Sequence, residues 1–270
     1  MDAHIGQNFL ANRNVAEKIV KRFFPVEGEI LEIGPGKGIL TELLIKNRQG
    51  NKITAVELDN VLYYKLKEKY TENIDFLNRD ILKIDLLRLF PDAPSGVNLI
   101  GNVPYYISKE LIDWVIRYFP KVKKGIFMMQ KEFVDKLGAA VGTRDYNAQA
   151  VTFNRLFRLE KLFDVQPGSF TPQPRVKSTV FLFEPANANG REPIAIPDFY
   201  RFVQHCFSQR RKTVLNNFAE LSGIESLWDA FEALHINPKA RAEELTLEEF
   251  EAVYRYYRCS HEKVLGENNK

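Results

Sequence analysis

Residues 102–105 (NVPY) combine groups that could hold an adenine amine for methyl transfer. That amine is a weak nucleophile because its lone pair is delocalised into the ring. The Asn102 side-chain oxygen and the Val103 carbonyl could accept both amine hydrogens and draw the nitrogen towards tetrahedral geometry. Pro104 stiffens the turn through its fixed φ, and Tyr105 could stack on the base. For the tetrapeptide alone, the alternative is an ordinary Asn-x-Pro turn beside a core tyrosine.

A glycine-rich turn and two acidic residues indicate a cofactor that contains a nucleoside. Gly34 and Gly36 lie in EIGPGKG (residues 32–38), where glycine lets the backbone approach a ligand and the following helix offers free N–H groups. Glu57 ends the second strand, where doubly wound folds place a ribose-binding carboxylate. Asp80 follows the third strand. An acid at that position is typical of S-adenosylmethionine methyltransferases, in which it faces the adenine.

Simpler explanations exist for each of these features taken singly. EIGPGKG could be a tight strand-to-helix turn without a ligand, and either acid could be a solvated loop charge. An NAD-dependent oxidoreductase is a further alternative, but the spacing here is G-x-G-x-G rather than G-x-G-x-x-G. Because all three elements fall at the carboxyl ends of consecutive predicted strands, where open α/β sheets bind ligands, the set favours a methyltransferase cofactor site.

Two further sets of side chains could contact a nucleic acid. Phe170 lies on a loop stiffened by three prolines, and its ring could clamp the second face of an extruded base; the alternative is a phenylalanine that fills the domain junction. Clusters of lysine and arginine are candidate phosphate contacts, although a solvated charged surface explains them equally well. They comprise Lys123, Lys124, Arg210, Arg211 and Lys212.

Short apolar runs alternate with amphipathic stretches through the first two thirds of the chain, which predicts a mainly parallel sheet with helices on both faces. The predicted strands are residues 29–33, 52–56, 74–77, 97–100 and 125–130, with helices over 40–46, 61–70 and 109–118. Residues 157–165 and 177–184 are β-rich with a proline-rich loop between them, so we expect them to pair as an antiparallel edge.

The composition changes near residue 186, where a turn-rich linker begins. Four short helices are predicted beyond it, over residues 199–207, 213–221, 226–234 and 247–257, and Thr246 with Glu249 predicts a capping box at the last. We therefore predict a methyltransferase domain over residues 1–185 and an all-α domain over 186–270. The first part has 27 basic and 22 acidic side chains, whereas the second has 11 and 13.

Composition excludes several classes of protein. The 270 residues are 45% hydrophobic and 27% charged, which is ordinary globular composition. Two cysteines are too few for a disulfide scaffold, and the histidines show no metal-ligand spacing with them, so no metal is expected. No apolar run approaches the ~18 residues of a membrane span and the polar N-terminus does not resemble a signal peptide. We expect a soluble, cytoplasmic monomer.

Eight short segments extend the pattern over nearly the whole chain. They are GQNFL (6–10), EIGPGKG (32–38), VELD (56–59), GNVPYYIS (101–108), MQKE (129–132), SFTPQPRVKS (169–178), QRRKT (209–213) and RAEEL (241–245). In this order they resemble the KsgA (RsmA) family of rRNA adenine dimethyltransferases, with the Erm methyltransferases as second choice. The sequence has Tyr106 where many family members have asparagine, so the wall beside the base is expected to differ.

The resemblance implies a Rossmann-like S-adenosylmethionine methyltransferase fold. Its sheet has seven mostly parallel strands with the last one antiparallel, and a small helical domain follows. The implied activity is dimethylation of two adjacent adenosines near the 3′ end of small-subunit (16S) rRNA, with the rRNA or the immature 30S subunit as partner. The implied contacts to S-adenosylmethionine come from Asn8, Leu10, Gly34, Glu57, Asp80 and Asn102, of which Asn102 would also contact the target base. A non-catalytic assembly or transcription factor of the same fold is a further alternative.

Overall fold

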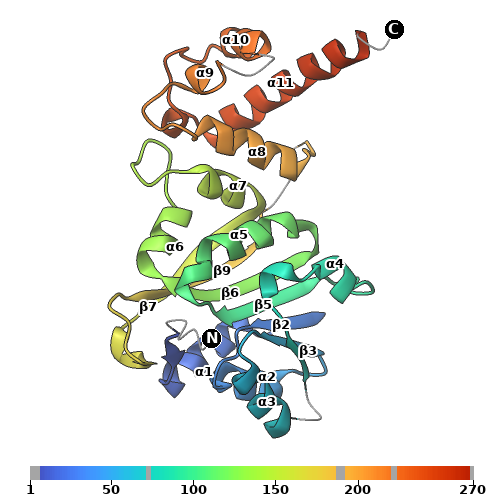
Figure 1. The fold of residues 1–270 in the computed structure, drawn as a ribbon, viewed down its shortest axis with the longest axis vertical. Helices are drawn as coiled ribbons and strands as arrows, with labels where there is room; N and C mark the ends of the chain where they lie inside the picture. The colour runs from blue at the N-terminus through green and yellow to red at the C-terminus, as the bar shows by residue number, and fades with distance from the viewer. Residues whose placement is uncertain (1–6, 71–73, 187–191, 220–223, 268–270) are drawn as a thin grey trace. The chain divides into compact units, whose positions relative to one another are not determined.

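The structure is a computed structural model, and it describes residues 7–70, 74–186, 192–219 and 224–267 (Figure 1). The strands are β1 (Phe9–Leu10), β2 (Glu29–Ile33), β3 (Ile53–Glu57), β4 (Asp75–Asn78), β5 (Val97–Asn102), β6 (Val122–Gln130), β7 (Phe157–Val165), β8 (Phe170–Thr171) and β9 (Ser178–Pro185). Seven of these form one sheet in the order β4-β3-β2-β5-β6-β9-β7. The predicted seven-stranded sheet is therefore confirmed.

Strand direction within the sheet also follows the prediction. Strands β2 to β6 pair in parallel, whereas β9, the last strand in the chain, is antiparallel to both β6 and β7. The predicted antiparallel pairing of residues 157–165 with 177–184 is confirmed, but β9 is not at the edge: it lies between β6 and β7. As a result, the start of β9 lies beside the carboxyl end of β6, where Ser178 pairs with Gln130.

The helices are α1 (Arg13–Phe23), α2 (Ile39–Asn47), α3 (Asn60–Lys69), α4 (Leu86–Leu89), α5 (Ser108–Arg117), α6 (Lys131–Leu137), α7 (Ala148–Leu156), α8 (Ile196–Cys206), α9 (Val214–Asn217), α10 (Ile224–Ala233) and α11 (Leu247–Glu267). Helices α1 and α2 pack on one face of the sheet, and α5 lies across the other (Figure 1). The central strands are buried on both faces, which is why they read as continuous apolar runs.

Contacts divide the chain into two compact units. Unit 1 comprises Met1–Val134 and Leu156–Ala186, and unit 2 comprises Asp135–Arg155 and Asn187–Lys270. Within unit 2, Tyr146, Ala150 and Val151 share an apolar core with α8, α9, α10 and α11. Residues 135–155 therefore group with the C-terminal helices, whereas the predicted domain boundary near 186 assigned them to the first domain. Whether residues 1–185 and 186–270 are independent domains stays a prediction.

The C-terminal helices differ from the prediction at their ends. The capping box is confirmed, because the Glu249 N–H donates to the Thr246 hydroxyl and the Thr246 N–H donates to the Glu249 carboxylate. Helix α11, which begins just after this cap, extends to Glu267 rather than to 257. Helix α9 ends at Asn217, well short of the predicted end at 221, and residues 220–223 lie outside the described residues.

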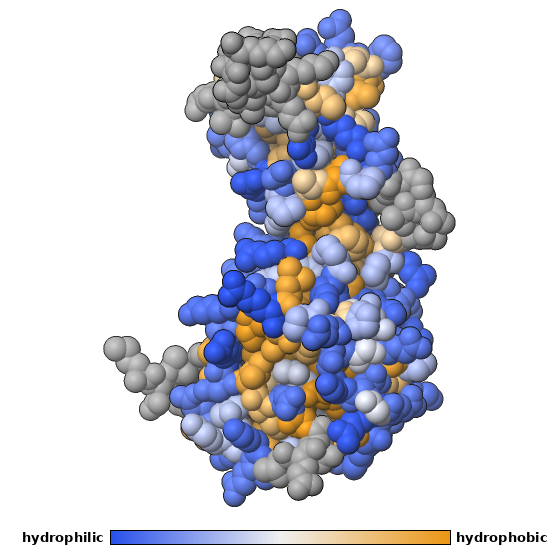
Figure 2. Space-filling model, turned by 90° about the vertical axis from the view of Figure 1, so that its right-hand side faces the viewer, coloured by the Kyte–Doolittle hydropathy of each residue, from blue (hydrophilic) through white to orange (hydrophobic). Residues whose placement is uncertain are grey.

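The surface of the described residues is mixed in character. Figure 2 shows hydrophilic residues over much of the face that it views, with hydrophobic residues in patches between them. None of the described helices is both long enough and apolar enough to cross a membrane.

Candidate active site

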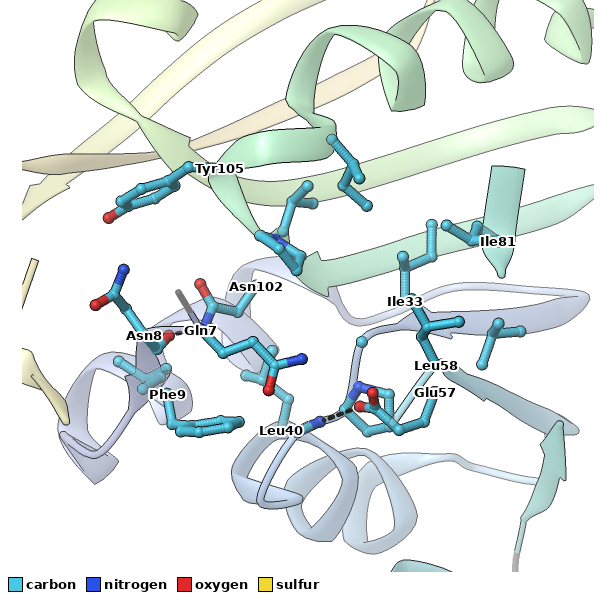
Figure 3. Close-up of a pocket in the computed structure, with 18 of the residues that line it drawn as sticks. Gln7, Asn8, Phe9, Ile33, Leu40, Glu57, Leu58, Ile81, Asn102 and Tyr105 are labelled. Carbon is cyan, nitrogen blue, oxygen red and sulfur yellow. Dashed lines mark hydrogen bonds between the residues drawn. The ribbon is translucent and has the colours of Figure 1, made fainter. Parts of the chain in front are cut away.

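A cavity of about 270 Å³ lies at the carboxyl ends of β2, β3, β4 and β5 in unit 1. Ten of the predicted site residues line it: Asn8, Leu10, Gly34, Gly36, Glu57, Asp80, Asn102, Val103, Pro104 and Tyr105. Figure 3 shows Glu57 and Leu58 towards one end of this pocket, Tyr105 towards the other and Asn102 between them. The structure therefore brings these residues together, while their individual roles stay predictions.

The glycine-rich turn is shaped by backbone that only glycine adopts readily. Gly34 and Gly36 have φ values of 65° and 58°, in the left-handed region. A Cβ at Gly36 would meet the Phe9 ring at 2.9 Å, so the turn also needs glycine to pass under that ring. These two features bring bare backbone to the floor of the pocket, where a ligand could approach it closely.

Glu57 is held at the pocket wall by backbone donors. Its carboxylate accepts hydrogen bonds from the N–H groups of Gly36 (3.0 Å) and Asp59 (2.9 Å), and the residue is only 3% exposed. Burial raises the pKa of Glu57, and the two backbone hydrogen bonds oppose that rise. Each oxygen retains acceptor capacity beyond its one bond, so the carboxylate could accept two ligand hydroxyl groups.

Glu32 is a buried acid to which the sequence analysis assigned no role. It lies in β2 just before the glycine-rich turn, and it is completely buried. Neither carboxyl oxygen has a hydrogen-bond partner in the described structure. Burial raises the pKa of Glu32 to about 8, with a further rise from the charge of Glu57, while the neighbouring Thr41 lowers it. Near neutral pH this carboxyl group is therefore largely protonated.

Asp80 begins the short turn after β4. One carboxylate oxygen accepts a hydrogen bond from the Leu82 N–H at 3.0 Å, and the other lies 4.0 Å from the ammonium of the exposed Lys83. Asp80 lines the pocket, and so do Leu58 and Ile81. Leu58 directly follows Glu57 in the sequence, and Ile81 directly follows Asp80. Their positions just after strand ends are the sequence signal that could have identified them as pocket residues.

Asn102 is oriented by a single donated hydrogen bond. Its Nδ2 donates to the Asn8 carbonyl at 3.0 Å, which leaves Oδ1 as the acceptor that faces the pocket; Figure 3 shows this oxygen on the side of Tyr105. Just after β5, the N–H of Val103 donates a hydrogen bond of 3.1 Å to the carbonyl of Met128 in β6. The backbone at Val103 is therefore fixed next to Asn102.

Tyr105 and Phe170 lie in different environments. The Tyr105 ring lines the pocket and is half-buried, and its hydroxyl is 2.8 Å from the Ser178 hydroxyl. Phe170 is only 4% exposed and does not line the pocket. Strand β8 pairs with β1, so Phe170 lies opposite Leu10 in the apolar core that α1 completes. A base-clamp role for Phe170 would require the ring to leave this core, and that role stays a prediction.

Tyr106 lies close enough to Asp80 and Glu57 to be affected by their charges, whereas we expected it in the wall beside the base. It is half exposed and lines the cavity. Burial raises the pKa of Tyr106, as do the charges of Asp80 and Glu57. Those two acids are the predicted ribose and adenine contacts, so Tyr106 forms part of the wall near them as well as continuing the segment that carries Tyr105.

The residues predicted to contact phosphates form two groups, one in unit 1 and one in unit 2. Lys123 and Lys124 lie near the amino end of β6, away from the sheet edge that carries the pocket. The Lys124 ammonium is 4.0 Å from the Glu184 carboxylate and the side chain is 15% exposed; burial lowers its pKa. The structure therefore favours a structural ion pair for Lys124. In unit 2, an exposed turn before α9 carries Arg210, Arg211 and Lys212.

The residues that the structure describes include no group of three or more His, Cys, Asp or Glu side chains arranged to hold a metal ion. Cys206 and Cys259 are both free thiols. Burial strongly raises the pKa of Cys206, so its thiol is not a nucleophile at neutral pH.

The amino-acid sequence is similar to known proteins over nearly its whole length. Residues 2–258 match the family model described as ribosomal RNA adenine dimethylase. Proteins named ribosomal RNA small subunit methyltransferase A are similar over most of their length. The one from Koribacter versatilis is 34% identical over 93% of this chain and 93% of its own. The one from Aromatoleum aromaticum is 36% identical over 97% and 96%.

Solved structures show the same fold. A dimethyladenosine transferase from Plasmodium falciparum superposes with a TM-score of 0.76 at 22% identity, covering 91% of this chain and 95% of that one. The 23S rRNA methyltransferase ErmE superposes with a TM-score of 0.65 at 23% identity, covering 93% of this chain and all of that one. The predicted methyltransferase fold with a helical C-terminal region is confirmed.

Proposed function

This chain belongs to the ribosomal RNA adenine dimethylase family, and on that premise we propose that it dimethylates the exocyclic amines of two adjacent adenosines near the 3′ end of small-subunit rRNA. The methyl donor would be S-adenosylmethionine. The substrate would be the rRNA within an immature 30S subunit, in the cytoplasm. The relatives named small-subunit methyltransferase A support this choice of RNA.

The observation that carries the proposal is the orientation of Asn102. Because Nδ2 is committed to the Asn8 carbonyl, Oδ1 is presented as an acceptor next to the Val103 carbonyl. Two acceptors side by side match the two hydrogens of an adenine amine. Holding both hydrogens favours a tetrahedral nitrogen and localises its lone pair. Such preorganised polar groups at a reacting centre typically contribute about 10²–10³ in rate.

The pocket fits the proposed cofactor. Left-handed glycines bring bare backbone to its floor, the buried Glu57 retains acceptor capacity for ribose hydroxyls, and Asp80 lies beside apolar walls that suit adenine. Gly34, Asn8 and Leu10 would contact the methionine part. When bound, S-adenosylmethionine would supply an electrophilic methyl group on a positively charged sulfur.

The protein's own residues hold and orient the target, and no general base is needed. Asn102 and Val103 hold the amine, Pro104 keeps their backbone rigid, and the half-buried Tyr105 ring offers a stacking surface for the adenine. The proton that remains on nitrogen after transfer is acidic enough to leave to water. Because the adenine must leave its stack to reach Asn102, extrusion of the base is part of the proposal.

Two alternatives use the same fold. An Erm-type enzyme would methylate 23S rRNA, and the structural match to ErmE keeps that possibility in the test. A non-catalytic assembly factor would bind the subunit without methyl transfer. Unmodified 30S subunits and unmodified 50S subunits incubated separately with labelled S-adenosylmethionine distinguish the three. Label in 30S RNA supports the proposal, label in 50S RNA supports the Erm-type activity, and no label in either would overturn both enzymatic assignments.

A further inference from the structure

A single buried serine anchors the ring of Tyr105. The Tyr105 hydroxyl lies 2.8 Å from Ser178 Oγ, across 73 positions of the sequence. Ser178 is fully buried, so its hydroxyl has no access to water and depends on a protein partner. Tyr105 is the hydrogen-bond partner that the structure provides for it. Burial raises the pKa of the Tyr105 phenol, so the group is protonated and able to donate this bond.

The sheet topology explains how these residues meet. Strand β9 runs antiparallel between β6 and β7, so its first residue, Ser178, lies opposite Gln130 and Val165, where those two strands end. Asn102 lies at the same edge of the sheet, because it pairs with Met128 two residues before the end of β6. The start of β9 is thus fixed in the sheet close to the residues that hold the amine.

The ring of Tyr105 needs such an anchor. Tyr105 begins a one-turn 3-10 helix directly after Pro104, and no side chain caps that turn. Its ring is only half-buried in the pocket wall. A hydrogen bond from the tip of the side chain to a rigid strand restricts both side-chain torsions at once, whereas packing on one face leaves the ring able to swing over the pocket.

We propose that Ser178 is a positioning residue that sets the Tyr105 ring at the angle needed to stack on the extruded adenine. This inference rests on the proposed function, since it assigns Ser178 to the target half of that same site. The last residue of the SFTPQPRVKS segment then has a defined task. Ser178 touches neither cofactor nor base, and it acts only through Tyr105.

Ser178→Ala and Tyr105→Phe remove the same hydrogen bond from its two ends. Each should lower kcat on unmodified 30S subunits by roughly three- to tenfold, the range of a net hydrogen bond, and the double variant should lose no more than either single variant. Affinity for S-adenosylhomocysteine should stay within about twofold. Thr179→Val is the matched control, because the buried Thr179 hydroxyl bonds to Asp164 instead, and it should keep wild-type kcat.

A readout independent of activity separates this proposal from the proposed function. With 3-fluorotyrosine at position 105, the full-length protein should give one narrow fluorine resonance, and Ser178→Ala should shift or broaden it while Thr179→Val does not. The positioning role would be overturned by an unchanged resonance in Ser178→Ala. It would also be overturned if the losses of kcat in the two single variants multiply in the double variant. If Ser178→Ala does not fold, two other variants test the same hydrogen bond. Tyr105→Phe removes it and should lower kcat, whereas Ser178→Thr keeps the hydroxyl and should retain kcat. If the wild-type protein has no methyltransferase activity but Ser178→Ala still shifts the fluorine resonance, the proposed function alone is overturned.

Discussion

Glu32→Gln should make unit 1 more stable at alkaline pH. The carboxyl group of Glu32 is completely buried, and its pKa is raised from 4.5 to about 8, mainly by burial. The folded protein therefore keeps a proton that the unfolded chain releases above about pH 4.5. The stability linked to that proton is complete below pH 4.5 and is lost as the pH rises towards 8.

The size of the effect follows from the pKa. One pKa unit corresponds to 1.36 kcal/mol, so the rise from 4.5 to about 8 implies a loss on the order of 5 kcal/mol by pH 9. Glutamine has nearly the same shape and carries no charge. The free energies of unfolding of Glu32→Gln and the parent should therefore be similar at pH 5, and the variant should be several kcal/mol more stable at pH 9.

Urea unfolding of the ligand-free, full-length protein measures this difference. Trp114 is buried in unit 1 and Trp228 is the second tryptophan of the chain, so a Trp228→Phe background makes the fluorescence report on unit 1. Glu27→Gln, which removes an exposed carboxylate near the same strand, controls for net charge. If the difference in free energy of unfolding between Glu32→Gln and its parent is the same at pH 5 and pH 9, Glu32 is not buried as the neutral acid.

Two further perturbations address ligand binding. Glu57→Ala should weaken binding of S-adenosylmethionine roughly tenfold to a hundredfold, because hydrogen bonds from ribose hydroxyls to a carboxylate contribute ~1.5–3 kcal/mol; unchanged affinity by calorimetry would remove Glu57 from the site. Replacement of Arg210, Arg211 and Lys212 by alanine should weaken RNA binding and flatten its salt dependence by up to ~0.7–0.9 log units for each phosphate that is no longer neutralised. An unaltered salt slope would reassign that exposed turn to ordinary solvated surface.

Much of the parallel sheet could be predicted because its strands are buried on both faces. Runs such as EILEI and the glycine-rich turn after it carry their structure locally, and β2 has the predicted bounds of Glu29–Ile33. The acids at successive strand ends follow from the same topology, since parallel strands end at one edge. Many of the residues that line the pocket are therefore predictable from the sequence.

Features that depend on distant partners were not predictable in the same way. Two-residue strands such as β1 and β8 exist only because they pair with each other, and that pairing buries Phe170 instead of leaving it on an exposed loop. Lys124 reads as a surface lysine until Glu184 comes beside it. Residues 135–155 belong to the methyltransferase segment by sequence, but their contacts place them with the C-terminal helices. In each case tertiary contacts, rather than local pattern, decide the environment.

Asn102 is proposed to present an acceptor to the target amine, and the proposed activity depends on this contact. The direct measurement is the amount of N6,N6-dimethyladenosine, by mass spectrometry of nucleosides from unmodified 30S subunits, formed by the wild type and by Asn102→Ala. Asn47→Ala removes a side-chain amide outside the pocket and serves as control. Wild type and control should form dimethyladenosine, and Asn102→Ala should form it at a rate lower by about 10²–10³ with its fold intact. Near wild-type formation by Asn102→Ala would contradict it.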